Sequence, residues 1–293
     1  MGTFKGRIVS IAILTATAGF ALSGCNDTAF TATADGTMLG QKDPLCNVGT
    51  SKKNLRIMFM VDDSGSTNTT DPSKKYRVQT LQQFIRDYGG NSNLSYTFGY
   101  FSGTTAMEYD MSSNKFTNDV SADPTGDSSE LAKALQSYEA LSSGGNTPYK
   151  AAFTSLTDTV KADENAGNKQ DYVVVFMSDG QPTDISGAAN LNGLVTSLKT
   201  AASANGSDLL LSTVYFGPET DSASIANLTG MAKTGSGQFV DTNKLAAGGL
   251  VINDIISIPG CQPTSVAAKS STPTRAPASI SSAPRAPSLL TTR

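Results

Sequence analysis

The chain has 293 residues, enough for one sizeable hydrophobic core, and its 25 acidic and 22 basic side chains leave a formal net charge of −3. It contains no histidine, which excludes Ser-His-Asp and Cys-His catalytic arrangements and any histidine metal ligand. The glycine patterns of phosphate-binding and dinucleotide-binding loops are absent from the sequence as well. Enzyme classes that depend on these groups are therefore excluded.

Residues 1–24 are predicted to be an export signal. Lys5 and Arg7 precede an uncharged, mostly apolar run over residues 8–22, which is too short for a comfortable membrane span. The following Leu-Ser-Gly-Cys sequence resembles the bacterial lipobox, which is cleaved before its cysteine. That resemblance implies acylation of Cys25, with several acyl chains forming a durable membrane anchor. An ordinary secretory signal with an incidental cysteine is the alternative.

Residues 25–45 are predicted to be the lipidated cysteine and a flexible tether, because few large apolar side chains occur there. By resemblance to enterobacterial sorting, Asn26 after the cysteine favours the outer membrane. We therefore expect a lipid-anchored protein of the bacterial cell envelope that faces the periplasm or the cell surface.

Strand-like and helix-like patterns alternate between residues 46 and 261, which predicts one α/β domain with helices on both faces of its sheet. Strands are predicted at residues 55–61, 93–102, 105–111 (a hairpin partner), 172–177, 209–216 and 238–240, and helices around residues 78–88, 131–141, 148–160, 225–231 and 245–256.

The first predicted strand ends in a cluster of oxygen-bearing side chains. Its apolar run is followed by Asp62, Ser64 and Ser66, with Gly65 allowing a tight turn. Since open α/β sheets bind their ligands at the carboxyl ends of the strands, this turn is a candidate site. Oxygen-only side chains suit a hard cation such as Mg²⁺, Mn²⁺ or Ca²⁺, whereas a plain serine-rich turn is the alternative.

Two later loops have a similar composition. Thr147 follows a double glycine and precedes Pro148, so we expect Pro148 at the first position of a helix and Thr147 as its cap. Asp179 follows the apolar strand at residues 172–177. Three loops therefore place hydroxyls or carboxylates at one predicted edge of the sheet.

These motifs together resemble the von Willebrand factor type A domain and its metal-ion-dependent adhesion site. The resemblance implies a doubly wound, Rossmann-like, mostly parallel sheet, and it covers roughly residues 46–261. It also implies that hydroxyls of Ser64, Ser66 and Thr147 bind a divalent ion, with Asp62 and Asp179 acting directly or through water. The expected ion is Mg²⁺, or alternatively Mn²⁺ or Ca²⁺. An acidic side chain of a partner protein would complete its coordination shell.

Asp63 and Asp184 lie near the predicted site in the sequence. Either these carboxylates tune the charge of the site, or they are plain loop residues.

Cys46 and Cys261 mark the two ends of the predicted domain. With Cys25 acylated, they are the remaining pair in an exported protein, where disulfides persist. A bond between them would join the ends of the domain, as in some members of the family that the chain resembles; two unpaired thiols are the alternative.

Residues 262–293 are predicted to be a disordered tail rich in Ser, Thr, Ala and Pro, with four basic residues and no acidic one. The rest of the exported chain is acidic, which argues against a nucleic-acid partner.

The sequence thus favours a non-enzymatic, envelope-anchored module that binds a protein through a divalent ion. One alternative is a structural envelope spacer whose metal only braces loops. The other is a metal-dependent phosphoester hydrolase that uses Asp62, Asp63 and Asp179.

Overall fold

The computed structural model describes residues 54–88, 91–108, 116–118, 129–245 and 255–256. The chain divides into two units, Met1–Gln41 and Lys42–Arg293, and all described residues belong to the second. The predicted signal, Cys25, the tether at residues 25–45, Cys46, Cys261 and the tail at residues 262–293 lie outside the described residues. Most of the helix predicted at residues 245–256 lies outside them too.

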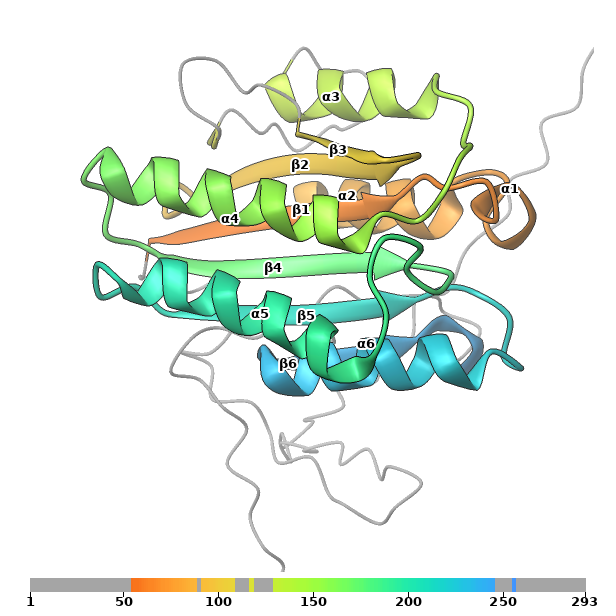
Figure 1. Ribbon diagram of the computed structural model, residues 1–293. Coiled ribbons are helices and arrows are strands. Elements are labelled where there is room, and N and C mark those ends of the chain that lie inside the picture. Colours follow the sequence, from red (N-terminus) through yellow and green to blue (C-terminus); the bar gives the residue numbers. More distant parts are fainter. Residues whose placement is uncertain (1–53, 89–90, 109–115, 119–128, 246–254, 257–293) are drawn as a thin grey trace, which may run out of the picture. The chain divides into compact units, whose positions relative to one another are not determined.

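A six-stranded sheet forms the centre of the described structure (Figure 1). Its strand order is β3-β2-β1-β4-β5-β6; β2 and β3 pair antiparallel, and all other neighbouring strands pair in parallel. This arrangement confirms the predicted α/β fold with a mostly parallel sheet. The strands are β1 (Leu55–Asp62), β2 (Leu94–Ser102), β3 (Thr105–Glu108), β4 (Asp171–Ser178), β5 (Leu209–Tyr215) and β6 (Ser236–Asp241).

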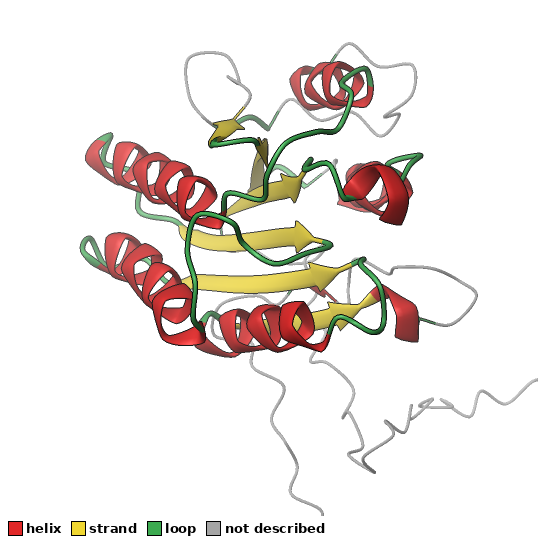
Figure 2. Cartoon of the chain, turned by 45° about the vertical axis from the view of Figure 1, so that its right-hand side comes forward, coloured by secondary structure: helices red, strands yellow, loops and turns green. Residues whose placement is uncertain are grey.

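Helices cover both faces of the sheet (Figure 2), so the central strands must be apolar on both sides. Ile57 and Phe59 of β1 pack into one buried cluster, and the alternate residues Met58 and Met60 pack into the other. The helices are α1 (Thr67–Thr70), α2 (Lys75–Tyr88), α3 (Glu130–Glu139), α4 (Tyr149–Asn165), α5 (Ala188–Ser203) and α6 (Ser222–Thr234), followed by a short 3-10 helix at Thr242–Lys244.

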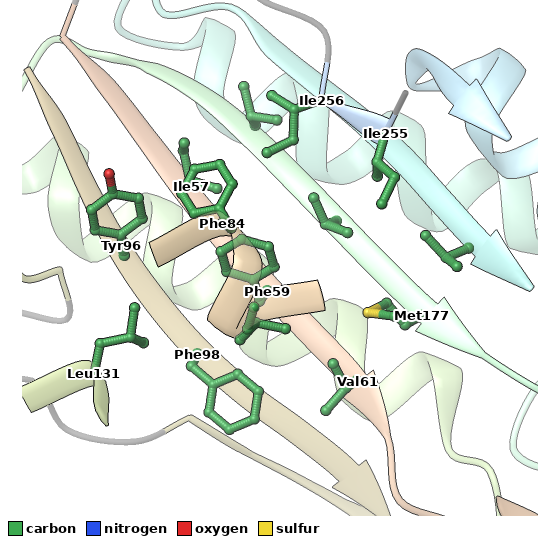
Figure 3. Packing of buried hydrophobic residues seen from close by; sticks show 14 of the residues in the cluster. Ile57, Phe59, Val61, Phe84, Tyr96, Phe98, Leu131, Met177, Ile255 and Ile256 are labelled. Atoms are coloured by element: carbon green, nitrogen blue, oxygen red, sulfur yellow. The ribbon is translucent and has the colours of Figure 1, made fainter. Parts of the chain in front are cut away.

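Helices α2 and α3 pack on one face of the sheet, and α4, α5 and α6 pack on the other. Figure 3 shows the first cluster, where Phe84 of α2 lies against Phe59 of β1 and Tyr96 of β2, with ring centroids 5.3 Å apart in both pairs. Ile255 and Ile256 are buried in the same cluster. These two residues therefore pack on the α2 face of the sheet.

Helix α5 was not predicted, although its pattern is present in the sequence. Leu191, Val195 and Leu198 recur at helical spacing and are buried against the sheet. Polar residues and Gly193 between them make the apolar stripe less obvious. Leu141, predicted within the helix at residues 131–141, lies beyond the end of α3 and is 37% exposed.

An aromatic cluster supports the carboxyl edge of the sheet from the α4 side. Phe176 of β4 stacks on Phe101 of β2 with ring centroids 5.0 Å apart, and Tyr149 of α4 meets Phe176 edge-to-face at 4.9 Å. The Tyr149 hydroxyl donates to the carbonyl oxygen of Gly180 at 2.8 Å. The first turn of α4 is thus fixed to the loop after β4. Among the described residues, no helix is long and apolar enough to cross a membrane.

Candidate metal centre

The predicted site residues lie at the topological switch point of the sheet. The chain passes from β1 to β2 and β3 on one side, and later places β4, β5 and β6 on the other. The carboxyl ends of β1 and β4 are therefore the place where open α/β sheets bind their ligands. Asp62 ends β1 and Asp179 directly follows β4, so both lie at this edge. The short helix α1 lies beside the same edge (Figure 1).

The Asp62 carboxylate is completely buried and has protein partners at both oxygens. The backbone N–H of Ser64 donates to Oδ1 at 2.8 Å, and the hydroxyl of Ser178 donates to Oδ2 at 2.5 Å. The first bond closes the tight turn after β1, and the second ties β1 to β4. Asp62 therefore joins the two loops that carry most of the predicted ligands.

Ser64, Ser66 and Asp179 form a connected chain of oxygen atoms. The Oγ atoms of Ser64 and Ser66 are 3.1 Å apart, and the Ser66 hydroxyl donates to Asp179 Oδ1 at 2.9 Å. Thr70 of α1 donates to Asp179 Oδ2 at 2.5 Å. Ser66 is exposed, whereas Ser64 and Asp179 are buried. Four of the five predicted ligands, Asp62, Ser64, Ser66 and Asp179, thus form one hydrogen-bonded group. Ser66 is its solvent-exposed member.

Thr147, the fifth predicted ligand, is brought to the same edge through its backbone. Its N–H donates to the Thr183 hydroxyl oxygen at 3.1 Å, and its carbonyl oxygen accepts from the Thr183 N–H at 2.9 Å. The Gly65 N–H donates to the carbonyl oxygen of Gly145 at 2.9 Å. The loop before α4 is therefore held between the loop after β1 and the loop after β4.

The second glycine of the pair before Thr147 has a steric reason. Gly145 has a positive φ of 74°, and a Cβ there would lie 2.7 Å from the Cα of Gly103 in the β2–β3 turn. Both the dihedral angle and the close approach require glycine at this position.

The predicted start of α4 was wrong in two respects. The helix begins at Tyr149, and Pro148 occupies the cap position with no side-chain capping bond, so Thr147 is not the cap. Instead, the carboxylate of Asp184 accepts from the N–H groups of Lys150 and Ala151, each at 3.0 Å. Asp184 thus satisfies two free N–H groups of the first turn from another loop, where negative charge is also favoured.

Asp63 is engaged in a buried ion-pair cluster and is not a free carboxylate. Its Oδ1 lies 2.8 Å from Arg77 Nη1 and 3.7 Å from Lys74 Nζ, and it accepts from the Ser143 hydroxyl at 2.6 Å. The two cations balance the negative charge of Asp63, and the hydroxyl donates a hydrogen bond to it. Asp63 therefore joins the loop after β1 to the loop before α4.

Arg77 was not predicted to support the site, yet its side chain is fully buried beside it. Its Nη1 donates to the carbonyl oxygen of Asp62 at 3.0 Å and to the Tyr138 hydroxyl oxygen at 2.9 Å, in addition to Asp63. Its Nε and Nη2 donate to the Asp71 carboxylate and carbonyl at 3.1 and 2.8 Å. The burial of Arg77 could have been predicted from its spacing. It lies on the same face of α2 as the buried residues Leu81 and Phe84, at i+4 and i+7.

In the metal-free protein, burial disfavours the ionised forms of both site carboxylates. It raises the pKa of Asp62 to about 7, assisted by repulsion from Asp179 and opposed by hydrogen bonds from Ser178 and Ser64. Burial likewise raises the pKa of Asp179, against the hydrogen bonds from Thr70 and Ser66 and the charge of Arg77. A cation between these groups would favour their ionised forms.

The donor set fits a hard divalent cation that accepts hydroxyl ligands. Two carboxylates and three hydroxyls are all oxygen donors, which suit Mg²⁺ or Mn²⁺ better than softer ions. Within the described ranges, no group of three or more Cys, Asp or Glu side chains could hold a metal. A cation at this edge would therefore depend on Ser64, Ser66 and Thr147 as well as on the two aspartates.

Comparison with known families agrees with this arrangement. Residues 57–181 match the family model of the von Willebrand factor type A domain, a stretch that runs from β1 to the loop after β4 and includes all five predicted ligands. This stretch of the chain is thus similar to the von Willebrand factor type A domain. No curated protein matches the chain.

Several solved structures are similar in fold. The SpRpn10 VWA domain is 14% identical with a TM-score of 0.45, covering 64% of this chain and 86% of that one. The ArnB paralog VWA2 from Sulfolobus acidocaldarius is 14% identical with a TM-score of 0.43, covering 66% of this chain and 42% of that one. The pilus adhesin SpaC from Lactobacillus rhamnosus GG is 12% identical with a TM-score of 0.44, covering 64% of this chain and 28% of that one. All three TM-scores lie below 0.5, and nothing about this chain is concluded from these likenesses.

Replacing Arg77 with Met should lower the free energy of unfolding by about 3–5 kcal/mol, because the carboxylates of Asp63 and Asp71 lose a buried partner. Urea unfolding followed by circular dichroism measures the change. Arg86→Met, at an exposed position in the last turn of the same helix, is the matched control and should have little effect. Equal effects of the two substitutions would contradict the assigned role of Arg77.

The metal-free protein should lose stability between about pH 4 and pH 7 because of Asp62. Its folded-state pKa is about 7, above the ordinary value of 3.8, so the folded protein binds the proton more tightly than the unfolded chain does. The resulting stabilisation is complete below pH 4 and is lost as the pH rises to 7, on the order of 4 kcal/mol in all.

Urea unfolding at several pH values in the presence of chelator tests this titration. Asp62→Asn keeps an acceptor for the Ser64 N–H but cannot ionise, so its stability should change less over the same range. Parallel pH profiles for the two proteins would show that Asp62 does not titrate in this window.

Proposed function

We propose that this chain is a divalent-metal-dependent protein-binding module for adhesion or complex assembly. The observation that carries the proposal is the hydrogen-bonded group of Asp62, Ser64, Ser66 and Asp179 at the switch point of the sheet. It joins two separate loops and reaches the surface at Ser66. Domains of this family bind protein ligands, which is consistent with the proposal.

The charge of the donor set explains why metal binding becomes partner binding. Neutral hydroxyls leave a bound cation with more positive charge than a cage of carboxylates would. Mg²⁺ prefers six oxygen ligands and accepts mixed shells, so a further anionic ligand is favourable. The partner is therefore a protein that presents an Asp or Glu side chain to the surface around Ser66, and the interaction requires no catalysis.

A second function, a spacer whose metal only braces the loops, has one observation in its favour. Every carboxylate oxygen of Asp62 and Asp179 already has a hydrogen-bond donor within the protein. Loops that are closed without a partner need no further ligand. The binding experiment below separates the two functions.

Asp179→Ala should fold but lose metal-dependent binding, by more than about tenfold in affinity, because it removes one of two carboxylates at the site. The purified protein serves as bait for envelope extract, in Mg²⁺ and in chelator, with Asp62→Ala alongside. A band that appears only with wild-type bait and Mg²⁺ would support the proposal and identify the partner. Asp158→Ala, an exposed aspartate of α4, is the matched control and should bind like the wild type.

Two results would contradict the proposal. Identical bands in all lanes would favour the spacer. Metal-dependent turnover of a generic phosphate ester that is lost in Asp179→Ala would instead favour the hydrolase.

We also propose that the module is anchored to the bacterial envelope through acylated Cys25, which rests on the export signal and the lipobox-like residues 22–25. Wild-type protein should fractionate with membranes, and Cys25→Ser should release it or leave it unprocessed, since the acyl chains provide the membrane affinity. Cell fractionation followed by immunoblotting measures this, and membrane association of a processed Cys25→Ser protein would contradict it.

A further inference from the structure

The loops that carry the predicted ligands are joined by a network that lies beside the candidate metal centre. Arg77 Nη1 donates to the carbonyl oxygen of Asp62 at 3.0 Å and to the carboxylate of Asp63 at 2.8 Å. The same Asp63 oxygen accepts from the Ser143 hydroxyl at 2.6 Å. One guanidinium and one carboxylate therefore connect the end of β1 to the loop that leads to Thr147.

Backbone hydrogen bonds continue this connection towards the ligands. The Gly144 N–H donates to the carbonyl oxygen of Asp63 at 2.9 Å, and the Gly65 N–H donates to that of Gly145 at 2.9 Å. Asp63 thus holds the loop before α4 with both its side chain and its backbone. On the first loop, these contacts are made by Asp63, which lies between the predicted ligands Asp62 and Ser64. On the second loop, they are made by Ser143 and Gly144, a few residues before Thr147.

Lys74 fixes the beginning of the same loop. Its Nζ donates to the carbonyl oxygens of Tyr138 and Leu141 at 2.5 and 2.9 Å, at the end of α3. Lys74 has a positive φ of 52°, which is unfavourable for a residue with a Cβ and persists only where surrounding contacts hold it. The region before α2 therefore holds the loop from both Lys74 and Arg77.

We propose that Arg77, Asp63 and Ser143 form a positioning network that sets the separation between the two ligand-bearing loops, so that divalent-cation affinity depends on residues that do not touch the cation. This inference rests on the function proposed above. Its physical basis is that Mg²⁺ demands near-ideal octahedral geometry at 2.0–2.1 Å, so a small displacement of one loop weakens several bonds at once.

Ser143 offers the sharpest test, because it is only half-buried and its loss leaves Asp63 paired with Arg77. Ser143→Ala should raise the dissociation constant for Mg²⁺ or Mn²⁺ by about tenfold, as removal of partners behind metal ligands commonly does. Ser143→Thr keeps the hydroxyl and should restore most of the affinity. Ser137→Ala, an exposed α3 serine that donates to the Lys133 carbonyl oxygen at 2.9 Å, is the matched control and should not change it.

Isothermal titration calorimetry of the full exported protein gives the affinities, and urea unfolding shows whether each variant is folded. A second readout needs no metal: hydrogen exchange of the Gly144 amide in chelator should be faster in Ser143→Ala than in the wild type and Ser143→Thr. A merely structural serine would lower stability without changing the dissociation constant of the folded protein.

The outcomes are distinguishable. If the wild type binds the cation and Ser143→Ala binds it equally well, the positioning network is overturned while the metal site stands. If the wild type binds no divalent cation, both the proposed function and this inference fail. Tenfold weaker binding by Ser143→Ala with recovery in Ser143→Thr supports the network.

Discussion

The described structure around the candidate site depends on one buried cation. The guanidinium of Arg77 contacts the end of β1, the segment before α2 and the hydroxyl of Tyr138 in α3. A charge removed from water is tolerated only where opposite charges and hydrogen-bond acceptors surround it, and here Asp63 and Asp71 provide both. Because Arg77 must keep these partners, it fixes the end of β1, the segment before α2 and α3 relative to one another. The arrangement of the carboxyl edge of the sheet follows from these contacts.

The site itself separates two kinds of carboxylate. Asp63 and Asp71 contact Arg77 and are paired within the fold, whereas Asp62 and Asp179 receive hydrogen bonds from hydroxyls and an N–H group. Adjacent residues of one turn thus have opposite roles: Asp62 belongs to the candidate metal centre, and Asp63 belongs to the support beneath it. The raised pKa of Asp62 follows from this division, because burial and Asp179 act on it without a paired cation.

The loop before α4 shows how the parts are interlocked. Thr147 is clamped by Thr183, and the first turn of α4 is capped by Asp184 from the same neighbouring loop. Asp184 had been expected either to tune the site or to be a plain loop residue. In the structure its carboxylate caps the first turn of α4. It therefore helps to fix the position of the loop that carries Thr147.

The sequence by itself determined the sheet and which oxygen-bearing side chains follow its central strands. The mostly apolar strands β1, β4 and β5 are buried on both faces. Strands of that kind form parallel sheets, in which the carboxyl ends of the strands share an edge. This local pattern predicts that Asp62, Ser64, Ser66, Thr147 and Asp179 lie at one edge of the sheet. The helix α5 was also within reach, since its spacing is helical.

Only the tertiary structure decided how the donors are held. The partners of Arg77 come from Asp62, Asp63, Asp71 and Tyr138, up to 61 residues away, and no local pattern specifies which of them meet. The cap of α4 likewise comes from Asp184, 34 residues from Lys150. Hydrogen bonds and ion pairs between distant segments depend on how the sheet brings the loops together, so tertiary packing determined them, not periodicity.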